Sequence, residues 1–129
     1  MGKSYRDLIV WVKAIALVTE VYQISRTFPK HEMFGLQSQL QRTAVSIPSN
    51  IAEGWGRLSK GEFRLFLGHA RGSLAELETQ IIIAQNLNYL KNEDADKLQK
   101  MTEEVHRLIN GLISSLKTDK PNPHKKTKD

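Results

Sequence analysis

Apolar residues recur every three or four positions along most of the chain, which is the period of amphipathic α-helices. Breaks in this pattern predict four helices, over about residues 5–27, 32–55, 60–88 and 92–116. No stretch alternates at period two for long enough to predict a sheet. Because the connections are short, sequential helices should be antiparallel neighbours. The sequence therefore predicts an all-α, up-down-up-down antiparallel four-helix bundle.

Capping and breaking residues bound the first two predicted helices. Ser4 with Asp7 three positions later resembles a capping box, and Pro29 disfavours helical geometry in the residue before it. The first helix is therefore expected to end near residue 27. Gly54 and Gly56 are expected to end the second helix, because glycine readily takes the left-handed conformation of a helix C-terminus.

The third and fourth predicted helices have clearer N-terminal signals. Ser59 with Glu62 makes a capping box, and Asn92 is expected to cap the last helix. Behind these caps each helix carries one apolar seam that should face the core. The seams are Phe63, Leu67, Ala70, Leu74, Leu77, Ile81 and Ala84, then Leu98, Met101, Val105, Leu108 and Leu112, widened by Ile109, Ile113 and Leu116.

The segment from Ser46 to Arg57 is the most unusual part of the second helix. Pro48 lacks a backbone donor and crowds the carbonyl four residues earlier, a defect of about 3 kcal/mol in a helix interior. A polar and an apolar stripe run side by side through this segment at helical spacing. The polar stripe comprises Ser46, Asn50, Glu53 and Arg57, and the apolar stripe comprises Ala44, Ile47, Ile51 and Trp55.

The polar stripe has two interpretations. In the structural one, Glu53 and Arg57 make a favourably oriented i, i+4 pair. Ser46 and Asn50 then either meet backbone groups freed by Pro48 or fix the register of a helix interface. In the functional one, the stripe lines a polar groove that binds a partner or nucleic acid.

Two segments carry more apolar surface than one bundle can bury. Residues 8–12 and 81–84 are apolar around most of a helical turn, and such a helix needs a second neighbour. Each side chain left in water forgoes about 1.5–3 kcal/mol. We therefore expect a homo-oligomer with the first or third helix at the interface; the alternative is that the tail or loops cover these residues. Gly68 and Gly72, four positions apart, would allow close backbone approach.

Length and charge set the organisation of the chain. Its 129 residues suit one domain with its own core. The formal charge is +5, but residues 118–129 hold four lysines and two aspartates, so the remainder is only mildly basic. This segment has two prolines and no large apolar residue, so it cannot bury enough surface to order itself. We expect a four-helix bundle over residues 1–117 and a disordered basic tail over 118–129.

Several classes of protein are disfavoured. The lack of cysteine excludes disulfides, thiol nucleophiles and zinc sites with thiolate ligands. The N-terminus does not show the succession of a secretion signal, and no apolar run approaches the roughly 20 residues of a membrane span. We expect a cytoplasmic protein with no membrane partner.

Metal and enzyme chemistry find little support in the motifs. Four-helix bundles hold paired metals through Glu-x-x-His motifs on two helices, and this spacing occurs only once, at Glu103 and His106. Val105 lies on the expected buried seam, which turns both side chains away from the core. Neither a nucleophile elbow nor a phosphate-binding glycine loop is present. We expect no metal, no cofactor and no enzyme activity.

Basic residues near the second connection are candidates for nucleic-acid binding. Arg64 and Arg71 share a face of the third helix, and Arg57 and Lys60 precede them. Repeated around an oligomer, these four residues would form a positive ring or channel. The alternative is an ordinary solvated face whose cations pair with acidic neighbours. No recognition helix, zinc finger or aromatic stacking module accompanies the charge. The acidic neighbours are Glu62, Glu76 and Glu78.

A family resemblance adds to these expectations. The stretches that carry it are Asp7-Leu8 with Trp11, Phe28-Pro29, Gly35-Leu36, Gln39 to Arg42, Ser46 to Arg57, and Ala70 to Glu78. Together they closely resemble the bacterial four-helix-bundle family encoded in intervening sequences of large-subunit ribosomal RNA genes, across nearly all of residues 5–117. The family's motif positions matched here are Arg42, Asn50, Glu53, Gly54, Arg57 and Glu76.

The resemblance also bears on assembly and partners. The family looks related to the accessory protein of diversity-generating retroelements, a pentameric barrel that associates with reverse transcriptase and nucleic acid. It therefore implies a homopentamer, a homo-oligomeric barrel of bundles. Our leading hypothesis is a non-enzymatic oligomeric scaffold that associates with structured RNA or DNA through its basic surface. The alternative is a protein-interaction adaptor, such as a reverse-transcriptase partner, that binds no nucleic acid itself.

Overall fold

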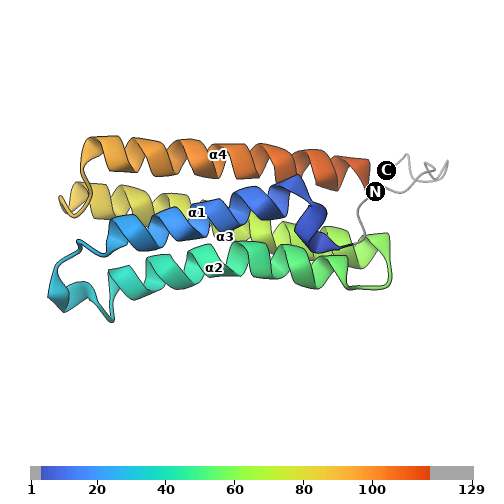
Figure 1. Cartoon of the computed structure of the whole chain (residues 1–129), viewed down its shortest axis with the longest axis horizontal. Helices are drawn as coiled ribbons and strands as arrows, with labels where there is room; N and C mark the ends of the chain where they lie inside the picture. The colour runs from blue at the N-terminus through green and yellow to red at the C-terminus, as the bar shows by residue number, and fades with distance from the viewer. Residues whose placement is uncertain (1–3, 117–129) are drawn as a thin grey trace, which may run out of the picture.

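Four long helices run up and down in a computed structural model whose described part is residues 4–116 (Figure 1). No strand occurs in that part of the chain, so the predicted all-α four-helix bundle is confirmed. The predicted tail over residues 118–129 lies outside the described residues, and the predicted barrel of several bundles stays a prediction. The elements are η1 (Tyr5–Asp7), α1 (Ile9–Ser25), η2 (Lys30–Glu32), α2 (Leu36–Trp55), α3 (Lys60–Asn86) and α4 (Asn92–Ser115).

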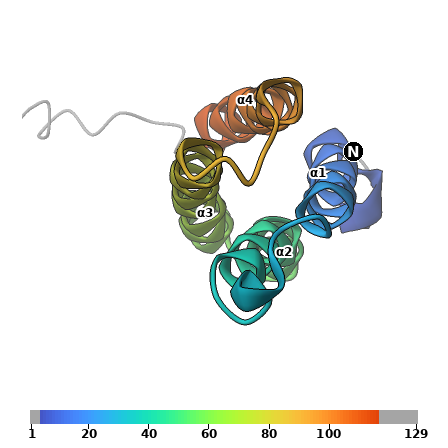
Figure 2. The same cartoon turned by 90° about the vertical axis from the view of Figure 1, so that its left-hand side faces the viewer.

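The helices occupy the corners of a square when the bundle is seen end-on (Figure 2). Helices that follow one another in the chain are neighbours, and α4 closes the square by packing on α1. The most extensive packing joins α2 to α3. Residues that line this α2–α3 interface therefore occupy the most firmly fixed part of the bundle.

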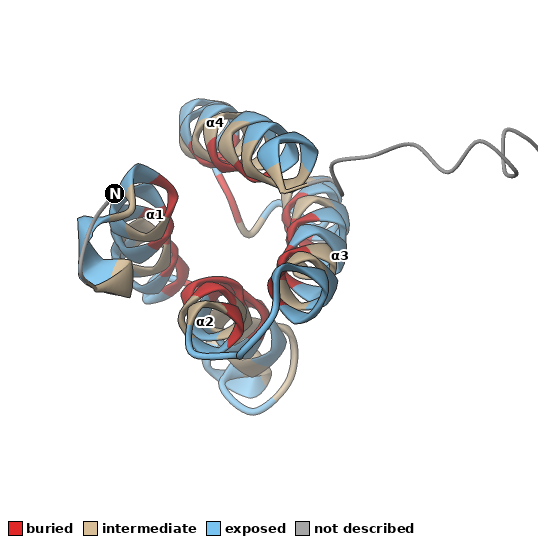
Figure 3. Ribbon diagram, turned by 90° about the vertical axis from the view of Figure 1, so that its right-hand side faces the viewer, coloured by how far each residue is buried: buried red, intermediate tan, exposed pale blue. Residues whose placement is uncertain are grey.

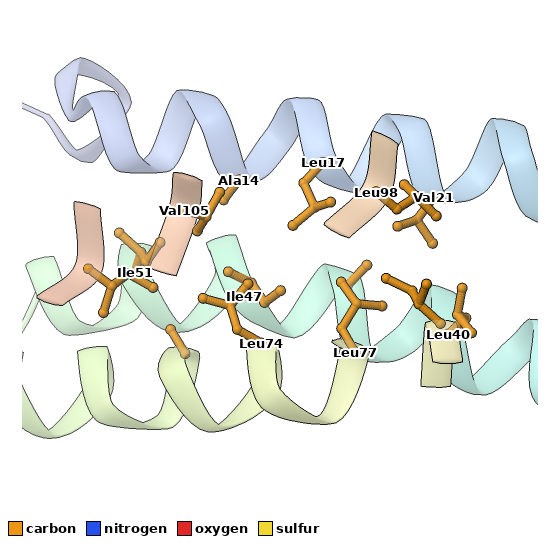
Figure 4. Packing of buried hydrophobic residues seen from close by; sticks show 14 of the residues in the cluster. Ala14, Leu17, Val21, Leu40, Ile47, Ile51, Leu74, Leu77, Leu98 and Val105 are labelled. Atoms are coloured by element: carbon orange, nitrogen blue, oxygen red, sulfur yellow. The ribbon is translucent and has the colours of Figure 1, made fainter. Parts of the chain in front are cut away.

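The core lies between the inward faces of all four helices, and the outward faces are exposed (Figure 3). Leu17, Ile47, Leu74 and Val105, one from each helix, are almost completely buried and point into the interior shared by the four helices (Figure 4). The whole predicted seam of α3 is buried. The predicted seam of α4 is more exposed to solvent than expected. Leu98, Val105 and Ile109 are buried, but Met101, Leu108 and Leu112 are only partly buried.

The first helix begins later than predicted. Ser4 accepts a hydrogen bond from the Arg6 N–H at 3.1 Å, but it caps only the 3-10 turn η1. Leu8 is extended, with φ −76° and ψ 127°, and α1 starts after it. This break folds the Tyr5 ring back against Trp11, with 5.3 Å between the ring centroids. The capping signal was therefore real, but it belongs to a separate turn.

Two other helix starts also differ from the prediction. The second helix begins at Leu36 rather than near residue 32, because Glu32 lies in η2 and its Oε1 accepts the Leu36 N–H from outside the helix at 2.9 Å. Asn92 is the first residue of α4 and not its cap, which is the extended Lys91. The Asn92 side chain instead accepts a hydrogen bond from Gln85 Nε2 at 2.9 Å.

We expected Gly54 and Gly56 to end α2 in left-handed geometry, and this expectation is wrong. No glycine of the described residues has a positive φ, and Gly56 ends α2 at φ −79°. Gly54 is needed for space: a Cβ there would lie 2.7 Å from Phe66 Cβ. A Cβ added at Gly68 or Gly72 would meet no atom within 4 Å, so neither glycine allows a close approach to a described helix. The close backbone approach therefore occurs between α2 and α3, at Gly54.

Candidate interaction surfaces

Polar residues of α2 and α3 meet along one line, which we call the α2–α3 seam. Three contacts set its antiparallel register. Gln80 Nε2 donates to Thr43 Oγ1 at 3.1 Å, and Ser46 and Ser73 hydrogen-bond through their Oγ atoms at 2.7 Å. The third contact, farther along, joins the side chains of Arg57 and Phe66. The seam comprises Arg42, Thr43, Ser46, Asn50, Glu53 and Arg57 on the α2 side and Phe66, His69, Ser73, Glu76 and Gln80 on α3.

A shallow polar hollow opens at one part of the α2–α3 seam. Its volume is about 360 Å³. Arg42 and Glu76 are exposed at its rim, and no ion pair joins either of them to another described residue. Buried beside it, Gln80 keeps one amide oxygen without a hydrogen-bond partner in the described residues. The lining residues are Gln39, Arg42, Thr43, Ser46, Ser73 and Glu76.

The polar stripe around Pro48 bonds to carbonyls other than the one that proline frees. Loss of the Pro48 N–H frees the Ala44 carbonyl. Ser46 Oγ instead donates to the Thr43 carbonyl at 2.6 Å, and Asn50 Nδ2 donates to the Ser46 carbonyl at 2.8 Å. The Ser46–Ser73 hydrogen bond agrees with a register-fixing role for Ser46 at a helix interface, whereas the Asn50 hydrogen bond stays within α2.

Arg57 does not pair with Glu53. Its guanidinium lies over the Phe66 ring, with 4.8 Å from Cζ to the ring centroid. The Phe66 ring in turn makes an edge contact with His69, at 5.5 Å between centroids. The Arg57 guanidinium thus lies on Phe66, and the Phe66 and His69 rings meet edge to face on the surface of the α2–α3 seam; we call these three residues the stack.

The four basic candidates do not form one face. Arg57 lies on the α2–α3 seam, whereas Arg64 and Arg71 reach the opposite flank of α3. Arg64 Nε donates to the Ile113 carbonyl at 3.3 Å, and Arg71 Nη1 donates to Asn110 Oδ1 at 2.9 Å. Both arginines are therefore engaged with α4, where Arg64 meets the negative end of the helix dipole. Lys60 is exposed at the first position of α3.

A second surface, the α1–α2 apolar face, carries no charged side chain along α1 and α2. The charged residues of α1 turn toward α4, where Lys13 pairs with Glu104 at 3.4 Å and Glu20 pairs with Lys97 at 2.9 Å. Those of α2 are Arg42 and Glu53, which belong to the α2–α3 seam. We define this face by Val12, Ile15, Val18 and Tyr22 on α1 and Val45, Pro48 and Ala52 on α2.

Large side chains stand in water on this face. Val12 is 51% exposed, Tyr22 42% and Ile15 38%. Beside them, a groove of about 390 Å³ runs between the two helices and is lined by Trp11 and Pro48, among others. The expected surplus of apolar surface on the first helix is therefore real, and no described loop covers it. Pro48 lines this groove from α2 together with Val45, Ser49 and Ala52.

One cluster ties the two loops at the far end of the bundle together. The Glu32 carboxylate accepts hydrogen bonds from the Leu36 N–H and from Tyr89 OH, each at 2.9 Å, and His31 Nε2 lies 3.8 Å away. These donors, the Leu36 N–H first, lower the pKa of Glu32. The hydrogen bond to the Glu32 carboxylate raises the pKa of Tyr89. Contacts between residues 57 positions apart were not visible in the sequence pattern.

Comparison of the chain with known proteins identifies its family and a structure of similar fold. A family model described as 23S rRNA-intervening sequence protein matches residues 6–111. The chain belongs to this family. Among solved structures, it resembles that of a protein of unknown function from the S23 ribosomal protein family of Bacteroides thetaiotaomicron. The TM-score is 0.77 at 20% sequence identity, covering 82% of this chain and 96% of the other. At that identity, the similarity supports the fold alone.

No match to the chain is found among curated proteins. The relation of the intervening-sequence family to retroelement accessory proteins stays a prediction. Within the described residues, no helix has the length and apolar character to cross a membrane. No group of three or more histidine, cysteine, aspartate or glutamate side chains there is placed to hold a metal ion. Glu103 and His106, which share the Glu-x-x-His spacing, line a shallow surface hollow on α4.

A usable signal for the α2–α3 seam existed in the sequence. Phe66, His69, Ser73, Glu76 and Gln80 recur every three or four positions and face the polar stripe of α2. The need for glycine at position 54 left no such signal, because it depends on how closely α3 approaches. The polar stripe could therefore be predicted, but its partner stripe and the stack at its end required the packed helices.

Proposed function

We propose that this intervening-sequence family protein is a non-enzymatic cytoplasmic scaffold, assembled from several copies of the chain, that associates with nucleic acid. The α1–α2 apolar face carries the proposal. A monomer that kept Val12, Ile15 and Val45 in water would forgo their burial, about 1.5–3 kcal/mol for each large aliphatic side chain. A second copy of the chain offers the simplest cover, and family resemblance favours five copies in a ring.

Charge supports the nucleic-acid part of the proposal. Residues 4–116 hold 13 basic and 12 acidic side chains, so only +1 of the total +5 belongs to them. Lys3 and residues 117–129, which hold five lysines and two aspartates, account for the other +4. In an assembly, each copy would add these positive chain ends to the same particle, and the attraction for phosphates would grow with the number of copies. The family description, which refers to ribosomal RNA, makes structured RNA the first ligand to test.

Two measurements test this function. Light scattering coupled to gel filtration should give a mass several times the 14.7 kDa of one chain. Titration of labelled structured RNA at several salt concentrations should show binding that weakens as salt rises, because cations on the protein displace condensed counterions. A strict monomer at high protein concentration would overturn the scaffold, and no RNA binding at about 50 mM salt would overturn the nucleic-acid part.

One observation favours the adaptor as a second candidate. Phe34, in the loop before α2, is 91% exposed, and Met33 beside it is 48% exposed. Exposed aromatic side chains on a fixed loop are typical anchors for a protein partner. Reversing the charge of Lys60 and removing residues 117–129 should abolish RNA binding and leave an intact oligomer if the scaffold binds RNA directly. Retained capture of a protein partner by that variant would favour the adaptor.

A further inference from the structure

We infer that the α2–α3 seam is a binding site for single-stranded nucleic acid, with the stack of Arg57, Phe66 and His69 as the platform for an unpaired base. The inference rests on the proposed association with nucleic acid and names its form and its site. Single strands are bound where aromatic and guanidinium planes lie beside a polar groove that contains cations, since every base presents a π-face. The α2–α3 seam has such planes and carries two arginines together with two glutamates.

The stack is rigid enough to act as a platform. Phe66 is half-buried, and its Cβ lies where any side chain larger than glycine at position 54 would collide. The close approach of α2 to α3 therefore fixes the ring. Arg57 and His69, on either side of it, are exposed, with contacts of 4.8 Å and 5.5 Å to the Phe66 ring. A base can stack on the outer plane of Arg57 or His69 without moving the bundle.

Hydrogen-bonding groups continue from the stack along the α2–α3 seam. Asn50 and Ser46 follow on α2, and Ser73 faces them from α3. Ser46 and Ser73 line the polar hollow of about 360 Å³, which has Arg42 at its rim. At about 1.5 Å per residue, α2 extends about 20 Å from Arg42 to its end at Trp55, and Arg57 lies two residues beyond. A short run of nucleotides would span that distance, with its phosphates near the two arginines.

The charges of the seam favour a single strand over a duplex. Glu53 and Glu76 are exposed between the two arginines. A duplex presents its phosphates outward and would bring them against these carboxylates. A single strand can turn its bases toward them instead, and a glutamate oxygen accepts a hydrogen bond from a base amino group. Mixed charge therefore fits base-facing recognition better than the binding of a phosphate backbone.

The test uses the full chain and a short oligoribonucleotide that carries one 2-aminopurine, offered single-stranded or in a duplex of equal length. Arg57→Lys keeps the charge but removes the planar group, and His69→Ala removes the exposed ring. Each variant should bind the single strand about tenfold more weakly and lose the quenching of 2-aminopurine. Binding of the duplex should not change. Both side chains are exposed, so the unfolding midpoints should match that of the unaltered protein.

Lys100→Gln, an exposed charge change on α4, is the matched control and should leave binding of the single strand unchanged. Equal binding of the single strand by all variants would overturn the inference while leaving nucleic-acid association intact. The same tenfold loss on the duplex would also overturn it, because stacking requires an unpaired base. If the unaltered protein binds neither form, the proposed function fails, and the inference fails with it.

Discussion

The two flanks of α2 face different chemistry. Toward α1, the helix presents Val45, Pro48 and Ala52 to a groove without charged side chains. Toward α3, it presents Thr43 and Ser46, which make hydrogen bonds to Gln80 and Ser73. Both flanks belong to the same helix, so their different residues reflect what each flank contacts. Hydrogen bonds that join α2 to α3 fix a register within one chain, whereas an exposed apolar flank remains available to another chain.

The largest expected effect comes from adding charge to the α1–α2 apolar face. The double substitution Val12→Glu with Ile15→Glu should abolish assembly, because two carboxylates would have to be buried at the interface. Light scattering should then give the 14.7 kDa mass of one chain. Both side chains are exposed, so the free energy of unfolding of the monomer should change by about 1 kcal/mol or less.

A control for this prediction lies on the charged side of the bundle. Lys100→Glu with Arg107→Glu also adds two carboxylates at exposed positions, but on α4. This variant should keep the oligomeric mass. Loss of assembly in both variants would mean that net charge, rather than the α1–α2 apolar face, controls self-association.

Glycine substitutions should separate the α2–α3 seam from the outer surface of α3 with a smaller effect. Gly54→Ala should destabilise the protein by about 1–2 kcal/mol, since the new Cβ would meet Phe66 Cβ at 2.7 Å and overpacking exceeds the gain in helix propensity. Gly72→Ala should stabilise it by about 0.5–1 kcal/mol, because its Cβ meets nothing within 4 Å. Urea unfolding midpoints measure both, and a stabilised Gly54→Ala would contradict the close approach.

The smallest expected effect concerns the hydrogen bond between Glu32, in the loop before α2, and Tyr89, in the loop after α3. Because its hydrogen bonds lower the pKa of Glu32, the ionised carboxylate stabilises the fold above the ordinary value of 4.5, and this stabilisation is lost as pH falls through the lowered value. Glu32→Gln should therefore be less stable than the unaltered protein near pH 7. The difference should shrink in acid, as urea midpoints at successive pH values would show. A constant difference would argue against this linkage.

The spacing of apolar residues and the positions of helix-breaking residues were sufficient to predict the four helices and most of the core. The seam of α3 from Phe63 to Ala84 is buried as predicted, because one face of a 27-residue helix must meet the core whatever its neighbours are. Helix starts were harder. A side chain can cap a separate turn, as Ser4 does, or reach a helix from outside it, as Glu32 does, and local sequence does not distinguish these cases.

The candidate surfaces could be predicted only in part. The polar stripe of α2 and the surplus apolar residues of α1 follow from spacing within one helix. Which residues of α3 face the stripe depends on the register between two helices, and the fixing contacts are 27 and 37 residues apart. The basic residues show the same limit, because Arg57 and Arg64 occupy opposite flanks of α3 only once α4 is packed against it.

The short connection between α2 and α3 has a consequence for the order of folding. Only residues 56–59 separate the two helices, and Ser59 caps the second by accepting the Glu62 N–H. Closing so short a loop costs little conformational entropy, and it brings together the helix pair with the most extensive packing. This hairpin is therefore the expected nucleus on which α1 and α4 condense. Core truncations in Ile47 or Leu74 should slow folding, whereas Val105→Ala should mainly speed unfolding.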